Sequence, residues 1–183
     1  ELWIINTKTK KVKKLNNLKL NASMGRPFYW LSDNNTIICT SVFSKRGKAP
    51  EKPSFSDGPV VQESFGKVAA SRTYPDLLSN PYDELLFDYY FNSQIISVTL
   101  DNKIKKIGEK AIIGNIEPSP DGKYILVEKI KRPYSYVVTY YRFSEKVEIW
   151  DKNGNLVKVL TNIPLQEEVP TSFGAVATGP RSL

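Results

Sequence analysis

The same hairpin pattern occurs three times along the chain, and this repeat limits the possible folds more than any other feature of the sequence. Each copy has an apolar stretch, a polar turn, and a second stretch that mixes hydrophobic residues with lysine. The copies are LWIINTKTKKVKKL (2–15), IISVTLDNKIKKIG (95–108) and VEIWDKNGNLVKVL (147–160). Their turns are rich in Thr, Asp, Asn and Gly, which suit tight turns. The repeat therefore predicts antiparallel hairpins.

A second kind of hairpin lies between these copies. WLSDNNTIICT (30–40) and PSPDGKYILVE (118–128) each place a polar turn before an extended apolar run. We expect inner hairpins over 27–43 and 112–131, beside outer hairpins over 2–15, 94–107 and 146–160. One outer and one inner hairpin together make a four-stranded antiparallel unit.

The spacing of these units favours a β-propeller. From Asp101 to Asp151 the repeat interval is 50 residues, close to the ~40–50 residues of a propeller blade. The predicted fold is mainly β: a partial β-propeller of about two and a half four-stranded blades, with a helical insertion. A flat β-sandwich is the structural alternative, because it also has short strands with regular turns.

The predicted organisation is a fragment of one propeller domain. The chain begins with Glu1 and ends in TGPRSL, and we expect it to be a piece of a longer protein. The expected parts of 1–183 are the end of one blade (1–15), a second blade (27–107) with an insertion (44–93), a third blade (112–160), and a linker into the next blade (161–183).

The insertion contains a helix signal. Asn80 can cap a helix, Pro81 suits its first position, and Asp83 and Glu84 favour the positive end of its dipole. A second helical pattern begins near Leu85. The apolar stripe that we expect to pack against the propeller consists of Leu85, Leu86, Tyr89 and Tyr90. The alternative is that its Asp-Tyr-Tyr cluster binds a ligand.

The basic composition is expected to reflect solvated strand faces. The formal net charge is +7, from 26 Lys and Arg against 19 Asp and Glu. The excess lies in 8–14, 103–106 and 129–132, where lysines are interleaved with Val12, Ile104 and Ile130. This pattern is typical of strands with one wet face, so we expect neither a nucleic-acid nor a membrane partner. No apolar stretch reaches the ~20 residues of a membrane helix, and we expect a soluble protein. The sequence leaves the compartment of the parent open, with a periplasmic or secreted parent as one option.

The residue types present exclude several kinds of active site. The 183 residues include no histidine and one cysteine, Cys39, which lies in an apolar run and is expected to be buried. A Ser-His-Asp triad or a zinc site of His or several Cys cannot be built from this chain. The pairs Glu167-Glu168 and Asp83-Glu84 are sequence neighbours, which does not give two carboxylates a shared acid–base geometry. We therefore expect no catalysis by this chain alone, and no metal or cofactor.

One loop is rich in arginine and tyrosine. In KRPYSYVVTYYRFSEKVEIW (131–150), Arg132 and Arg142 bracket Tyr134, Tyr136, Tyr140 and Tyr141. Arginine offers a bidentate fork for carboxylates, and tyrosine offers an apolar ring with a hydroxyl. The loop could contact a substrate. Alternatively, its tyrosines pack between blades and its arginines pair with local acids.

Two longer segments carry a family resemblance. QESFGKVAASRTYPDLLSNPYDELLFDYYFNSQ (62–94) and PSPDGKYILVEKIKRPYSYVVTYYRFSEKVEIWD (118–151), with the terminal GPRSL, resemble the N-terminal propeller region of prolyl oligopeptidase family serine peptidases, in particular the glutamyl endopeptidase-like or dipeptidyl aminopeptidase-like branch. The resemblance covers nearly the whole chain from about residue 26.

The resemblance implies a non-catalytic part of a peptidase. In that family an α/β-hydrolase domain carries the catalytic triad, and propeller loops admit and orient peptides. It thus implies gating and positioning of a peptide substrate beside a hydrolase domain absent from this chain. The implied substrate-facing residues are Arg132, Tyr134, Tyr136 and Arg142, with Arg72 and Arg181 as further candidates. The alternative function is a stand-alone propeller-like interaction or scaffold module. Self-association through exposed blade faces is a further expectation.

Overall fold

The computed structural model describes residues 1–54 and 74–168, and these residues are mainly β-strands. The strands are β1 (Leu2–Ile5), β2 (Val12–Leu15), β3 (Phe28–Trp30), β4 (Thr36–Ser41), β5 (Asn92–Thr99), β6 (Ile104–Pro118), β7 (Tyr124–Lys131), β8 (Ser144–Asp151) and β9 (Leu156–Ile163). One α-helix, α1 (Pro81–Phe91), and a 3₁₀ turn, η1 (Tyr140–Arg142), complete the described part.

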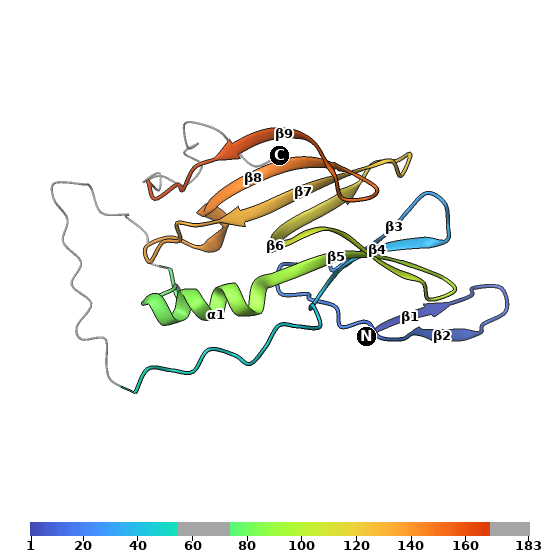
Figure 1. Ribbon diagram of the computed structural model, residues 1–183, viewed down its shortest axis with the longest axis horizontal. Helices are drawn as coiled ribbons and strands as arrows, with labels where there is room; N and C mark the ends of the chain where they lie inside the picture. The colour runs from blue at the N-terminus through green and yellow to red at the C-terminus, as the bar shows by residue number, and fades with distance from the viewer. Residues whose placement is uncertain (55–73, 169–183) are drawn as a thin grey trace.

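The strands form an antiparallel meander that curls on itself (Figure 1). Strands β3 to β9 make a seven-stranded sheet in sequence order, and β1 and β2 make a separate two-stranded sheet. The pairings confirm all five predicted hairpins. The tight turns adopt left-handed backbone at Lys10, Asn34, Asn102, Gly122 and Gly154, as the turn-forming residues require.

Strand β6 corrects the predicted separation of the hairpins over 94–107 and 112–131. It runs without a break for 15 residues. Residues 104–112 pair with β5, and residues 112–118 pair with β7. The two parts meet at Ile112, and no turn interrupts the strand, so one strand serves both hairpins.

Two hydrophobic cores lie on opposite faces of the middle strands. The first contains Ile38, Ile95, Ile107, Ile113, Ile116, Ile125, Val127 and Trp150, and the second contains Leu2, Leu15, Leu18, Ile37, Cys39, Ile96 and Val98. Because Ile37 and Ile38 point to opposite faces of β4, β4 and β5 contribute to both cores. The seven-stranded sheet therefore curls so that its second part, residues 112–118 of β6 with β7, β8 and β9, packs against its first part, β3, β4, β5 and residues 104–112 of β6. These two parts of one sheet and the separate β1–β2 sheet are called layers below.

Strand lysines reach the turns of the next hairpin and link neighbouring layers. The Lys13 ammonium donates to the Leu100 carbonyl at 2.6 Å, and the Lys105 ammonium donates to Asn153 Oδ1 at 2.7 Å. Gly108 has a φ of +60°, and a Cβ there would lie 2.1 Å from Trp150 Cζ3. Glycine is therefore required where the ring of Trp150 lies against β6.

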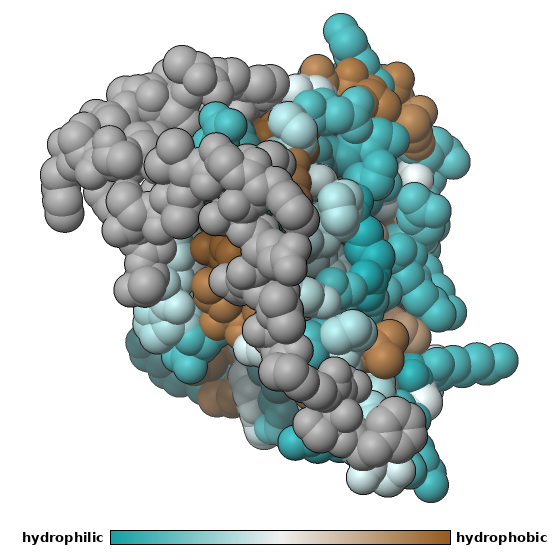
Figure 2. All heavy atoms as spheres, turned by 90° about the vertical axis from the view of Figure 1, so that its left-hand side faces the viewer, coloured by the Kyte–Doolittle hydropathy of each residue, from teal (hydrophilic) through white to brown (hydrophobic). Residues whose placement is uncertain are grey.

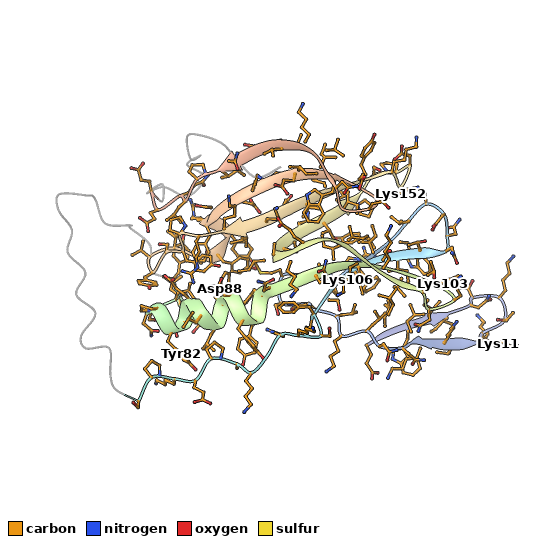
Figure 3. All side chains as sticks on the ribbon, in the orientation of Figure 1. Lys11, Tyr82, Asp88, Lys103, Lys106 and Lys152 are labelled. Carbon is orange, nitrogen blue, oxygen red and sulfur yellow. The ribbon has the colours of Figure 1, made fainter. Side chains whose placement is uncertain are left out.

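The basic turns gather at one end of the molecule. Figure 3 shows Lys11, Lys103 and Lys152 from three different hairpins at the end opposite α1, and all three are exposed. This agrees with the expected solvated lysines. Lys129 is the exception, because its side chain is only 10% exposed.

Helix α1 confirms the predicted cap but not the predicted buried stripe. The Asn80 side chain accepts a hydrogen bond from the Asp83 N–H at 2.9 Å, and Pro81 opens the helix. Phe87 is the buried residue of α1, whereas Leu85 and Tyr90 are 51% and 48% exposed. No second helix starts near Leu85 within the described ranges. Leu86 and Tyr89 are partly buried. The stripe was wrong because Phe87 packs against Tyr134 and Phe143 of the loop between β7 and β8, which turns Leu85 and Tyr90 away from the buried side.

Cys39 is fully buried, as predicted, and burial raises the pKa of its thiol to about 12. In the described ranges, no helix is both long and apolar enough to cross a membrane.

Candidate functional site

The arginine- and tyrosine-rich loop meets α1 at the end of the molecule opposite the lysine-bearing turns. This loop, residues 132–143, connects β7 to β8. Figure 3 shows Asp88 on the side of α1 that faces the strands and Tyr82 on the opposite side. Figure 2, which views this end, shows hydrophobic side chains as separate patches among hydrophilic ones. The helix thus lies between this loop and the segment that follows β4, which are far apart in sequence.

Two carboxylates of α1 hold Arg132. Glu84 and Asp88 are four residues apart and therefore share one side of the helix. The guanidinium forms an ion pair with Glu84 and another with Asp88, the latter at 2.6 Å. Hydrogen bonds with Asp88 and Glu84 raise the pKa of Arg132. The positive charge of Arg132 is therefore already balanced within the chain.

Tyr134, on the loop over 132–143, joins the same cluster. The residue is 9% exposed, and its hydroxyl donates to Asp88. Burial is the main cause that raises the pKa of this hydroxyl, and the bond to Asp88 adds to it. The ring centroid lies 5.0 Å from that of Phe87 and 5.2 Å from that of Phe143. Tyr134 thus supports the packing of α1 against the loop.

The other predicted site residues differ in their surroundings. Tyr136 is partly buried, and its pKa is raised by burial and by a hydrogen bond with Glu84. Arg142 ends η1, and its backbone carbonyl accepts a hydrogen bond from the Gln166 N–H at 2.9 Å. The structure therefore brings Arg132, Tyr134 and Tyr136 together on α1. Arg72 and Arg181 lie outside the described residues.

The opposite side of α1 binds the segment that follows β4, which the sequence did not single out. The Tyr82 hydroxyl donates to the Pro50 carbonyl at 3.2 Å, and the Tyr89 hydroxyl donates to the Gly47 carbonyl at 2.9 Å. The Arg46 guanidinium lies 4.1 Å from the centroid of the Tyr89 ring. The sequence feature that points to this contact is the seven-residue spacing of Tyr82 and Tyr89, which places both residues on one side of a helix.

Lys129 belongs to a buried ionic network, which corrects its predicted place on a wet face. Its ammonium lies 2.7 Å from Glu148, whose side chain is 2% exposed, and Lys146 reaches the same carboxylate at 2.6 Å. The Trp150 indole N–H donates to Glu148 at 2.8 Å. Burial acts to raise the pKa of Glu148, but these three hydrogen bonds outweigh it and lower the pKa to about 2. Cross-strand pairing of Lys129 with Lys146 creates this network, and a single strand's pattern does not reveal it.

The arrangement at α1 suits binding and positioning. The described residues contain no group of three or more potential metal ligands of the Asp, Glu, Cys or His type, and the chain has no histidine. The described groups with shifted pKa values near α1 are Arg132 and tyrosines, whose shifts come from local packing and pairing. Such groups can orient a partner through hydrogen bonds and ring contacts.

Comparison with known proteins gives two plant relatives. No protein-family model and no solved structure matches the chain. The chain is 41% identical over 157 residues to a probable chloroplastic glutamyl endopeptidase of Oryza sativa subsp. japonica, covering 85% of this chain and 17% of that protein. It is 38% identical over 186 aligned residues to a probable chloroplastic glutamyl endopeptidase of Arabidopsis thaliana, covering 100% of this chain and 19% of that protein. The chain thus spans less than a fifth of the length of two relatives that are both named as peptidases.

Proposed function

We propose that this chain is the non-catalytic β-propeller portion of a serine peptidase that cleaves after glutamate. The main support is the similarity across 85% and 100% of the chain to proteins named glutamyl endopeptidase. The stacked layers add to it, because four-stranded antiparallel units that bury their faces against each other are the building plan of a propeller. The shared strand β6 would then link two blades. In this proposal the catalytic triad lies on an α/β-hydrolase domain elsewhere in the parent.

The end that carries α1 and the loop over 132–143 is the proposed substrate-positioning end. Its connections are long, whereas the opposite end has tight turns, and functional residues concentrate on loops held by a rigid scaffold. Because Arg132 is neutralised by Glu84 and Asp88, its proposed role is to hold the loop in place. Tyr136 and Arg142 then remain the residues proposed to face a peptide.

The test is peptide cleavage by the full-length protein. We expect efficient cleavage after Glu and weak cleavage of the matched peptide with Gln. Replacing Arg142 with Ala should lower kcat/KM for the Glu peptide about tenfold or more, because a charge-assisted hydrogen bond is lost, and should affect the Gln peptide less. Lys158→Ala, at an exposed position on β9, is the control.

Two results would contradict the proposal. Equal loss on both peptides in Arg142→Ala would point to damaged folding instead of charge recognition. A full-length reading frame without a G-x-S-x-G strand-turn-helix followed by Asp and His, together with no cleavage of either peptide, would favour the scaffold function.

A further inference from the structure

A cleft of about 440 Å³ lies between β3 and the second half of β6. One wall is formed by Tyr29, Trp30, Leu31 and Ser32, and the other by Asn115, Glu117, Pro118, Ser119 and Pro120. Ser32 and Ser119 belong to the turns that follow these two strands. A Cβ at Gly122 would lie 3.2 Å from Ser32 Oγ, so the two turns approach each other closely. The cleft is thus built by corresponding strands of two neighbouring layers.

Both walls of the cleft have backbone edges without a strand partner in the described part of the chain. β3 pairs with β4 alone, and residues 113–118 of β6 pair with β7 alone. An unpaired edge presents a row of N–H and C=O groups that an extended peptide can join. The cleft can therefore recognise a peptide through its main chain.

The side chains of the cleft favour a positively charged ligand. Trp30 is 45% exposed, and Glu117 is exposed and forms no ion pair with any described residue. The Arg26 guanidinium lies 4.8 Å from the centroid of the Tyr29 ring, so that ring already has a cation of the chain beside it, and the ligand ammonium is placed at Glu117 instead. Aromatic rings attract ammonium groups when they are close.

A second carboxylate strengthens the negative potential beside the cleft. Glu128 lies on β7 opposite Asn115. Burial is the main cause that raises the pKa of Glu128, and the charge of Glu117 raises it further. A cation that binds at Glu117 would relieve this repulsion.

We propose that the cleft binds an extended peptide that carries an alkylammonium group, with the ammonium at Glu117 and the apolar part of the peptide against Tyr29 and Trp30. The ammonium is supplied by a lysine side chain or by a free amino terminus. This site is separate from the loop at α1 and does not depend on the proposed peptidase function.

The test is isothermal titration calorimetry of the full-length protein with short extended peptides that contain no acidic residue. Without glutamate they are not consumed by the proposed cleavage, so the result does not depend on peptidase activity. One peptide is acetylated and carries a central lysine, and a second replaces that lysine with norleucine. A third has a free amino terminus and no lysine. We expect the lysine or the free-amine peptide to bind about tenfold more tightly than the norleucine peptide, and the tighter of the two identifies the source of the ammonium.

Variants assign the binding to the cleft. Glu117→Gln should remove the preference over norleucine, whereas Glu51→Gln, at an exposed carboxylate outside the cleft, should retain it. Trp30→Leu should weaken binding of all three peptides, with an unchanged Tm showing that the fold is intact. Equal affinity for all three peptides would overturn the proposal, as would an undiminished preference in Glu117→Gln.

Discussion

Glu148 shows how one residue can determine local stability. A carboxylate buried in a sheet loses its hydration, and the ion pairs with Lys129 and Lys146 offset that loss. Removing one partner leaves the others buried and uncompensated, which costs more than the pair itself contributes. The exposed Glu109, in contrast, reaches Lys129 at 3.2 Å from solvent, where an ion pair contributes little.

Replacing Glu148 with Gln should therefore lower the free energy of unfolding by about 3–5 kcal/mol. Glu109→Gln, which removes a 75% exposed carboxylate from the same lysine, should change it by less than about 1 kcal/mol. Urea unfolding followed by circular dichroism measures both. Similar losses in the two variants would show that burial of Glu148 does not matter.

The same carboxylate makes stability depend on pH. Its pKa is lowered from 4.5 to about 2 in the folded protein. The stabilisation is therefore complete above the unfolded pKa and is lost as pH falls through the folded value. We expect urea midpoints to decrease between about pH 4.5 and about pH 2, and the decrease should be smaller in Glu148→Gln. An equal decrease in both proteins would assign the acid sensitivity to other carboxylates.

At the scale of elements, α1 is held by its N-terminal cap as well as by packing. Phe87 is its buried residue, and its contact with the loop is completed by the pairing of Arg132. The Asn80 side chain accepts one N–H of the first turn, a donor that has no partner within the helix.

Asn80→Ala should lower the free energy of unfolding by about 1 kcal/mol, and Asn80→Asp should restore most of it because Asp also caps helices. Amide hydrogen exchange in α1 should be faster in the Ala variant than in the unsubstituted protein. Exchange in β7 should be the same in both proteins. Unchanged exchange in α1 would show that packing alone holds the helix.

At the scale of the whole molecule, the stack of layers has an open outer face. On β1 and β2, Leu2 and Leu15 point inward, whereas Trp3, Ile5 and Val12 are 54%, 60% and 57% exposed. Contiguous apolar side chains at a surface favour association.

We predict that this face makes the chain self-associate. Light scattering should show dimers or larger species, and Ile5→Lys should shift them toward the monomer. Tyr141→Lys, which changes an 80% exposed aromatic residue away from this face, should leave the distribution unchanged. A monomer at high concentration without any substitution would contradict the prediction.

Local features of the fold could be predicted from the sequence, and features created between strands could not. The hairpins followed from turn residues such as Asn102 and Gly154, because a tight turn is specified by a few adjacent residues. The cap at Asn80 is local for the same reason. The burial of Lys129 and the clamp on Arg132 depend on partners 19 and 48 residues away, whose proximity is set by strand register and packing. The cleft between β3 and β6 likewise exists only after two layers have stacked.

The continuity of β6 couples two layers, because one strand pairs with β5 in the first layer and with β7 in the second. Because its halves belong to different layers, neither layer can be excised at a linker without cutting through a strand. A rotation of one layer relative to the next must bend this strand near Ile112, where the part paired with β5 meets the part paired with β7. Movements at one end of the stack are thus transmitted through the backbone itself.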